Sequence, residues 1–269
     1  MEITPYIKRL LTSHITGLSA AQLLAKPNLQ LASEEQKWFD EAVARLQNNE
    51  PLQHVLGYCE FYGRKFKCDG RALVPRPETE ELVEWIASNW STVNSQQSTV
   101  KILDIGTGTG CIALSLAKEL PEAKVSALDI SKEALSLARE NANILEVKNV
   151  DFIEGDILNK SFNSQLSTFN LIVSNPPYVR ECEKADMEPN VLDYDPHTAL
   201  FVSDTDPLIF YRAIGEFALT HLKPNGALYF EINQYLATET CDLLIALGYK
   251  NVELRKDIND NPRMIKATI

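Results

Sequence analysis

The sequence predicts an α/β fold in which a nucleotide-binding βαβ unit follows a separate helical segment. Two features establish the unit: the apolar run Val100–Ile105 leads through the glycine-rich segment Gly106–Gly110 into a helical pattern, and a second apolar run ends in Asp129. A third feature lies further on, where the apolar run Phe169–Ser174 stops at Asn175-Pro176-Pro177-Tyr178. With 269 residues, the chain has enough material for one large or two ordinary domains.

Residues 1–50 are expected to form a small helical domain. Two segments, Ser19–Gln22 and Ser33–Gln36, match the capping box of helix N-termini, and Pro27-Asn28 breaks the chain between them. The apolar residues after the second box fall at helical spacing, which indicates a bundle core. They are Trp38, Phe39, Ala42, Val43 and Leu46. The alternative is that part of this surface binds a substrate protein.

Residues 51–76 are expected to form a β-hairpin linker, because polar and apolar residues alternate there and Gly57, Gly63 and Gly70 interrupt them. Residues 77–269 then form the larger α/β domain. It begins with a helix from Glu78 to Ser88, and the polar residues 91–98 predict a loop before the first strand of the sheet.

The glycine-rich segment is typical of a turn that admits a ligand close to the backbone. Gly106, Gly108 and Gly110 permit a tight turn, and their spacing is G-x-G-x-G rather than the dinucleotide pattern G-x-G-x-x-G. Residues 124–129 read as the second strand. Asp129 at its end lies 19 residues past Gly110, the reach expected of a carboxylate that binds a ribose diol.

The remaining elements alternate between helices and strands in the same way. Residues 237–247 predict a helix that ends at Gly248, and a turn at 223–226 precedes the fifth strand. The last two strands are expected to form an antiparallel hairpin. The other predicted elements are a helix at 132–143 and strands at 149–154, 171–174, 226–232, 250–255 and 263–268.

Asn175-Pro176-Pro177-Tyr178 predicts a rigid recognition site at the carboxyl edge of the sheet. Proline cannot continue a strand, and it forces the residue before it into extended geometry. The segment therefore offers an amide side chain, a free carbonyl and an aromatic ring that can accept both hydrogens of a planar amine and stack on its face. This indicates modification of an amide or an exocyclic amine. The alternative is a strand terminator with a surface tyrosine.

Composition limits the partners and the compartment. The formal net charge of −11 disfavours unaided binding to nucleic acid. One cluster of basic residues stands out against this negative charge. Its side chains are either solvated, or they form a docking surface for a partner that is bound to nucleic acid. It comprises Arg64, Lys65, Lys67, Arg71 and Arg76.

Cytoplasmic localisation is expected, because no run of 18 apolar residues and no signal-peptide pattern occurs. The five cysteines are scattered without C-x-x-C pairs and read as reduced thiols. The four histidines show no metal-binding spacing, so no metal is predicted.

The order of these motifs resembles class I S-adenosylmethionine-dependent methyltransferases that methylate amino groups. The segment Glu50–Gly57 with Leu73–Glu80, and the tail Asp257–Met264, resemble the PrmC/HemK family of release factor glutamine methyltransferases. This resemblance covers nearly the whole chain and is weakest over the first 45 residues. It implies a Rossmann-like, mostly parallel sheet of seven strands after the helical domain and hairpin linker.

The resemblance also implies the cofactor contacts. S-adenosyl-L-methionine is expected along Gly106, Thr107, Gly108, Thr109 and Gly110, which would line its methionine portion and ribose. Asp129 would bind the ribose hydroxyls, Asp156 the adenine amine, and Ile157 the ring, where the family often has an aromatic residue. The alternative for Asp156 is a helix cap.

On the substrate side, Asn175 and the Pro176 carbonyl are expected to accept the two N–H hydrogens of a glutamine amide. Tyr178 would pack on the amide plane, and Pro177 completes the substrate contacts. Asn175, which also borders the cofactor, Pro176 and Tyr178 are thus the expected catalytic residues. No histidine or lysine lies in this motif, so catalysis is expected to rest on positioning.

The resemblance implies methylation of the side-chain nitrogen N5 of glutamine in the Gly-Gly-Gln motif of peptide chain release factors. The chain is expected to be a monomer without direct contact with nucleic acid. The main alternative is an N6-adenine or N2-guanine nucleic-acid methyltransferase, because such amines are also planar and conjugated. A non-catalytic adaptor that kept the fold and a nicotinamide dehydrogenase are further alternatives.

Overall fold

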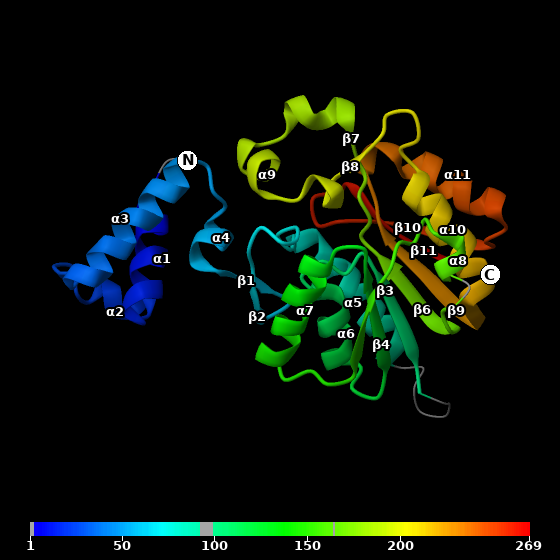
Figure 1. The fold of residues 1–269 in the computed structure, drawn as a ribbon, viewed down its shortest axis with the longest axis horizontal. Coiled ribbons are helices and arrows are strands. Elements are labelled where there is room, and N and C mark those ends of the chain that lie inside the picture. Colours follow the sequence, from blue (N-terminus) through cyan, green and yellow to red (C-terminus); the bar gives the residue numbers. More distant parts are fainter. Residues whose placement is uncertain (1–2, 92–98, 164) are drawn as a thin grey trace.

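The computed structural model describes residues 3–91, 99–163 and 165–269, and residues 92–98 of the predicted polar loop lie outside the described residues. Figure 1 shows an N-terminal group of helices beside an α/β part built on a central sheet. A short helix and a two-stranded hairpin connect the two. None of the helices in the described ranges is both long and apolar enough to cross a membrane.

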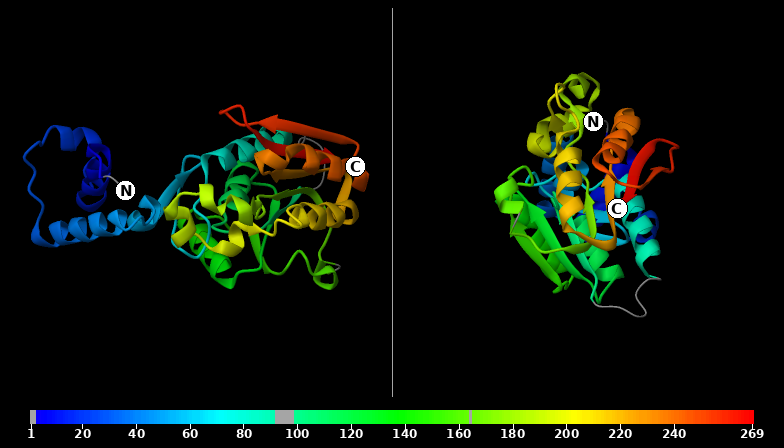
Figure 2. Two further views of the ribbon diagram at one scale, coloured as in Figure 1. Left: turned by 90° about the horizontal axis from the view of Figure 1, so that it is seen from above. Right: turned by 90° about the vertical axis from the view of Figure 1, so that its right-hand side faces the viewer.

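The N-terminal helices are α1 (Pro5–Thr16), α2 (Ala20–Leu24) and α3 (Ser33–Gln47). They lie at one end of the elongated molecule in Figure 2. A small separate core joins α1 and α3 to the short helix that follows, through Ile7, Leu11, Ala42, Leu46 and Val55.

Of the two predicted capping boxes, the one at Ser19–Gln22 is confirmed, with both reciprocal bonds present. The box at Ser33 is wrong. Ser33 is already helical, because Glu35 reaches back to the backbone N–H of Ala32 at 2.7 Å and sets the helix start one residue earlier.

The predicted linker contains both a helix and a hairpin. Residues Leu52–Leu56 form α4, which corrects the expectation of extended structure there: Pro51 precedes its first turn, and Gly57 ends it in the left-handed region at φ 76°. The hairpin consists of β1 (Tyr58–Phe61) and β2 (Arg64–Lys67). Its buried side chains, including Phe61 and Phe66, join the core beneath the sheet.

The central sheet has seven strands in the order β10-β11-β9-β6-β3-β4-β5. Neighbouring strands are parallel from β9 to β5, whereas β11 pairs antiparallel with both β9 and β10, as the predicted terminal hairpin requires. The strands are β3 (Lys101–Ile105), β4 (Lys124–Asp129), β5 (Val150–Glu154), β6 (Phe169–Ser174), β9 (Leu222–Glu231), β10 (Asn251–Lys256) and β11 (Pro262–Thr268). The predicted fold class is confirmed.

Helices cover both faces of this sheet, because strand residues alternate between two apolar cores. The helices of the α/β part are α5 (Pro77–Ser91), α6 (Cys111–Glu119), α7 (Lys132–Ile144), α8 (Lys160–Asn163), α9 (Pro189–Tyr194), α10 (Ile209–His221) and α11 (Ala237–Leu247). One core packs α5, α6 and the hairpin against residues such as Ile102 and Val173, and the other packs α10 and α11 against Leu103 and Ile172.

The segment between β6 and α10 folds over the carboxyl edge of the sheet. A short parallel pair, β7 (Val179–Arg180) with β8 (Phe201–Val202), closes this segment at its base. Between them lie the 3-10 turns η1 (Glu181–Asp186) and η2 (His197–Ala199), with α9 between the two turns, and a third turn, η3 (Gln234–Leu236), follows β9. Figure 1 shows this excursion standing above the strand ends.

Candidate active site

A cavity of about 420 Å³ lies at the carboxyl edge of the parallel strands. Its walls come from the glycine-rich turn after β3, the ends of β4 and β5, the segment after β6, and the stretch that precedes α5. Open α/β sheets bind ligands at this edge. Four of the five residues of the turn, Gly106 to Thr109, line it, as do Asp129, Asp156, Ile157, Asn175, Pro176 and Pro177.

The glycine turn brings the backbone close to the cavity and to the following helix. Gly110 has φ +82°, and a Cβ at this position would lie 3.1 Å from Leu114 Cδ1 and 3.2 Å from Ala138 Cβ. Gly110 therefore permits α6 to begin tightly against α7, and the backbone N–H groups at the start of α6 stay near the ligand.

Asp129 ties this turn to the end of β4. Its Oδ2 accepts a hydrogen bond from the Gly108 N–H at 2.8 Å, and its Oδ1 accepts one from the Ser131 N–H at 2.9 Å. The side chain is mostly buried yet borders the cavity, and burial raises its pKa while the backbone N–H bonds lower it. A carboxylate has about four lone-pair directions, so acceptor capacity remains for a ligand's hydroxyl groups.

A second carboxyl group, Asp104, lies beneath the turn and is fully buried. Its Oδ2 accepts from the Thr107 hydroxyl at 2.6 Å and from the Ala113 N–H at 3.2 Å, whereas its Oδ1 has no hydrogen-bond partner among the described residues. Burial, assisted by the charge of Asp129, raises the pKa of Asp104 to about 7 despite these bonds.

This raised pKa predicts that Asp104 destabilises the fold as pH rises. The folded state retains a proton that the unfolded state has already released between about pH 4 and 7, so the free energy of unfolding falls across that window. Replacement of Asp104 by asparagine should remove this term. In urea unfolding, the stability of wild type relative to D104N should fall by about 2 kcal/mol from pH 5.5 to pH 8. A constant difference would contradict the assignment.

Asp156 and Ile157 follow β5 and lie beside the end of β4. The Asp156 Oδ1 accepts from the Leu158 N–H at 2.8 Å, which is the local bond of a turn, and the side chain still borders the cavity. Ile157 is buried and also reaches the cavity wall. The positions of Asp156 and Ile157 agree with the predicted contacts to adenine, which stay a prediction.

The segment after β6 places Asn175, Pro176 and Pro177 along the opposite wall. The Asn175 Nδ2 lies 3.3 Å from the Thr79 hydroxyl oxygen. Tyr178 is not among the residues that line the cavity: its ring is partly buried in the core beneath, and its hydroxyl donates to Glu231 Oε1 at 3.1 Å. The structure thus brings three residues of the motif to the cavity and turns the fourth toward β9.

Comparison with known proteins agrees with this geometry. A family model described as a methyltransferase domain matches residues 96–268, and one described as the PrmC N-terminal domain matches residues 7–57. The release factor glutamine methyltransferase of Flavobacterium psychrophilum is 49% identical over 250 residues, which are 93% of this chain and 86% of that protein. The chain belongs to the release factor glutamine methyltransferase family.

Two further comparisons agree with this result, one for the family and one for the fold alone. The protein of the same description from Bacteroides thetaiotaomicron is 42% identical over 261 residues, or 97% of this chain and 91% of that protein. A methyltransferase from Pyrococcus furiosus has a TM-score of 0.54 at 21% identity, over 85% of this chain and 98% of that one, and supports the fold alone. The resemblance inferred from the sequence is confirmed.

One buried acid beside the cavity has a clear structural role. Asp195 is buried and accepts from the Arg76 guanidinium at 3.2 Å and from the Val74 N–H at 3.4 Å. These bonds fasten the segment after α9 to the stretch before α5. Pro196 and Phe201 of that segment also line the cavity, so these bonds help to hold this wall in place.

The cavity also uses residues that the sequence did not single out. Ile130 and Leu158 flank the Asp129–Asp156 end, and Phe210 and Ile214 reach it from α10. These residues carry no local pattern besides helix or strand periodicity, because their contribution depends on how distant elements pack.

The predicted basic cluster is largely neutralised within the chain. Arg64 pairs with Glu119, Lys67 and Arg71 pair with Glu140, and Arg76 pairs with Asp195. The ammonium of Lys65 lies 4.3 Å from the centre of the Tyr58 ring. Such pairing favours neither a free cationic surface nor fully solvated side chains.

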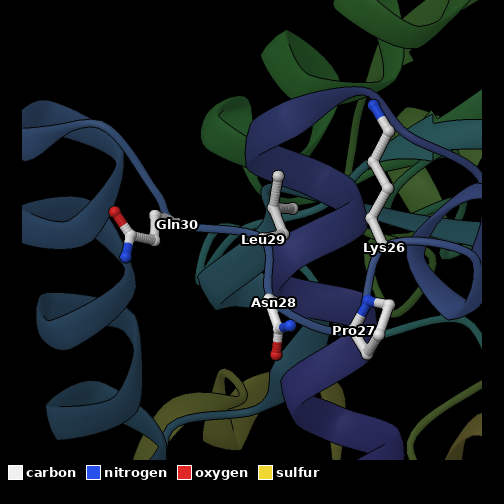
Figure 3. A pocket seen from close by; sticks show the side chains of 5 residues that line it. All are labelled: Lys26, Pro27, Asn28, Leu29 and Gln30. Carbon is white, nitrogen blue, oxygen red and sulfur yellow. The ribbon is translucent and has the colours of Figure 1, made fainter.

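A second hollow lies in the N-terminal helices, in the connection between α2 and α3 (Figure 3). Its volume is about 510 Å³, and Lys26, Pro27, Asn28, Leu29 and Gln30 line it. These five exposed residues are consecutive in one connecting segment, as the close-up shows. The hollow therefore lacks the convergence of distant polar groups that marks the cavity at the sheet edge.

Proposed function

We propose that this chain transfers a methyl group from S-adenosylmethionine to N5 of the glutamine in the Gly-Gly-Gln motif of peptide chain release factors. The observation that carries the proposal is the meeting of Asn175 with the glycine turn in one cavity, in a chain 49% identical to a release factor glutamine methyltransferase. The motif order predicted this chemistry, and the family membership supports it.

The cavity suits S-adenosylmethionine in size and in its polar groups. Its volume of about 420 Å³ falls within the usual range for small-molecule sites. We propose that the turn from Gly106 to Gly110 borders the methionine portion, that Asp129 accepts from the ribose hydroxyls, and that Asp156 and Ile157 hold the adenine. Ile130 and Leu158 add apolar surface at that end. When bound, the cofactor supplies an electrophilic methyl group on a sulfonium.

Catalysis is proposed to rest on positioning. A glutamine amide nitrogen is a poor nucleophile because its lone pair is delocalised into the carbonyl. Acceptors at Asn175 Oδ1 and the Pro176 carbonyl would fix both N–H groups, aim the nitrogen at the methyl carbon and stabilise the developing positive charge. The new N–C bond forms as the S–C bond breaks, and the nitrogen then releases its proton to water. Among the described residues that line the cavity, none is histidine or lysine.

The protein substrate is proposed to bind across both parts of the chain, with residues 1–50 as the recognition domain, 51–76 as the linker and 77–269 as the methyltransferase domain. We propose a cytoplasmic monomer that does not bind nucleic acid directly. The net charge of −11 and the pairing of the basic cluster support the absence of direct nucleic-acid binding.

The proposal is tested by incubating the purified chain with methyl-labelled S-adenosylmethionine and either a release factor or deproteinised nucleic acid. Label is expected on the Gly-Gly-Gln glutamine and should disappear when that glutamine is replaced by alanine. Label on nucleic acid instead would contradict the substrate while leaving the cofactor assignment intact.

A further inference from the structure

A chain of buried hydrogen bonds connects the cavity to the end of β9. The Thr79 hydroxyl, in the first turn of α5, donates to Glu231 Oε2 at 2.6 Å and lies 3.3 Å from Asn175 Nδ2. The Tyr178 hydroxyl donates to the other oxygen of Glu231. Ser174 pairs with Phe230 across the neighbouring strands β6 and β9, so the residues that follow, Asn175 and Glu231, lie at the same edge of the sheet.

The direction of each hydrogen bond follows from Glu231. The Thr79 hydroxyl donates to Glu231 Oε2, which as a carboxylate oxygen can only accept, so the proton of this hydroxyl points toward Glu231. The lone pairs of that hydroxyl then face Asn175, and only the amide nitrogen of Asn175 can donate to them. Its Oδ1 is consequently left for the cavity. A reversed amide would set Oδ1 against the Thr79 oxygen, with no proton between them.

We propose that Thr79 and Glu231 are positioning residues that orient the Asn175 amide so that its Oδ1 meets the substrate N–H. This rests on the proposed function, in which Asn175 accepts from the glutamine amide. With the amide reversed, Asn175 would present N–H groups to the N–H groups of the substrate, and the acceptor would be lost.

The burial of Glu231 supports a polar role for this residue, because packing alone would favour an apolar side chain at the same place. Its side chain is 1% exposed, in a region where an acid is unfavourable unless donors surround it. Burial raises the pKa of Glu231 above its usual value, and the Thr79 and Tyr178 hydroxyls and the charge of Arg263 oppose that rise. Both hydroxyls donate to the two oxygens of Glu231, so its carboxylate is an acceptor directly behind Thr79, where it can set the polarity of the hydroxyl.

The test compares two replacements of Thr79 that differ in one hydroxyl. Thr79→Val keeps the shape but removes the hydroxyl, and Thr79→Ser keeps the hydroxyl. T79V should lower kcat about tenfold, the effect of losing one orienting hydrogen bond, while the Kd for S-adenosylmethionine changes less than twofold. T79S should retain most of the wild-type kcat. Equal kcat in T79V and T79S would overturn the proposal.

A matched control is Thr240→Val. Thr240 is also buried in a helix, and its hydroxyl donates to the Leu236 carbonyl, away from the cavity. If the two variants have similar melting temperatures, the orienting role requires that T79V lose more kcat than T240V does. If both variants lose kcat equally, the effect is one of stability and the orienting role is rejected.

A double-mutant cycle separates the hydrogen bonds from Glu231 through Thr79 to Asn175, here called the relay, from the proposed function. Because the relay acts through Asn175, T79V should change kcat by less than twofold in an Asn175→Ala background, although it costs about tenfold in wild type. Independent, multiplicative effects would reject the relay. Absence of glutamine methylation by the wild-type chain would instead reject the function, so the two failures are distinguishable.

Discussion

Replacement of Asn175 by alanine is expected to lower the rate of methyl transfer by about two to three orders of magnitude, the usual cost of removing one preorganised polar group that stabilises a transition state. The side chain borders the cavity, and its Nδ2 is engaged by Thr79, so Oδ1 is the group the substrate would lose. The Kd for S-adenosylmethionine should change little, because the turn and Asp129 remain.

The measurement is single-turnover methylation of a release factor, together with calorimetric binding of S-adenosylmethionine to the same preparation. Asn143→Ala is the matched control, since Asn143 is an exposed residue of α7 and the chemical change is identical. A wild-type rate in N175A would remove Asn175 from the mechanism. A large loss of cofactor affinity would move its role from substrate to cofactor.

Elements encoded by local patterns were predictable from the sequence. The glycine turn and the strand ending at Asp129 form where expected, because strand periodicity, turn glycines and the following helix are all local features. The same holds for α11, which ends at Gly248 with φ 105°.

Failures occurred where one local signal competed with another. Ser33 looked like a helix cap, but the Glu35 carboxylate bonds to Ala32 and moves the start of α3. In residues 52–56, polar and apolar side chains alternate as they do in a strand. The segment is nevertheless a helix, which begins after Pro51, ends at Gly57 and is too short to be recognised from periodicity.

The candidate site shows the deeper limit. Its individual residues were predictable, but the relay behind Asn175 was not, because Thr79 and Glu231 are 152 positions apart in the sequence and meet only when α5 packs on the sheet. Tyr178 illustrates the same point: the motif suggested a ring facing the ligand, whereas Glu231 draws its hydroxyl toward β9. Whether the ring reaches a bound substrate stays a prediction.

Replacement of Asp129 by alanine is expected to weaken S-adenosylmethionine binding by about two to three orders of magnitude. Hydrogen bonds to a charged acceptor contribute roughly 1.5–3 kcal/mol each, and about 1.4 kcal/mol corresponds to a tenfold change in Kd. Alanine also removes the acceptor for the Gly108 and Ser131 N–H groups, so part of the loss would come from a loosened turn. The measured total therefore combines two contributions.

A ligand change separates the contact with the ribose from the support of the turn. S-adenosylhomocysteine and an analogue that lacks the ribose hydroxyls are titrated into wild type and D129A. If Asp129 binds the diol, the analogue should bind wild type much more weakly than the parent ligand does, and D129A should bind both about equally. If D129A still discriminates between them as strongly as wild type, the diol contacts another group. Asp129 would then act only by holding Gly108 and Ser131 in place, which the melting temperature of D129A would reveal independently.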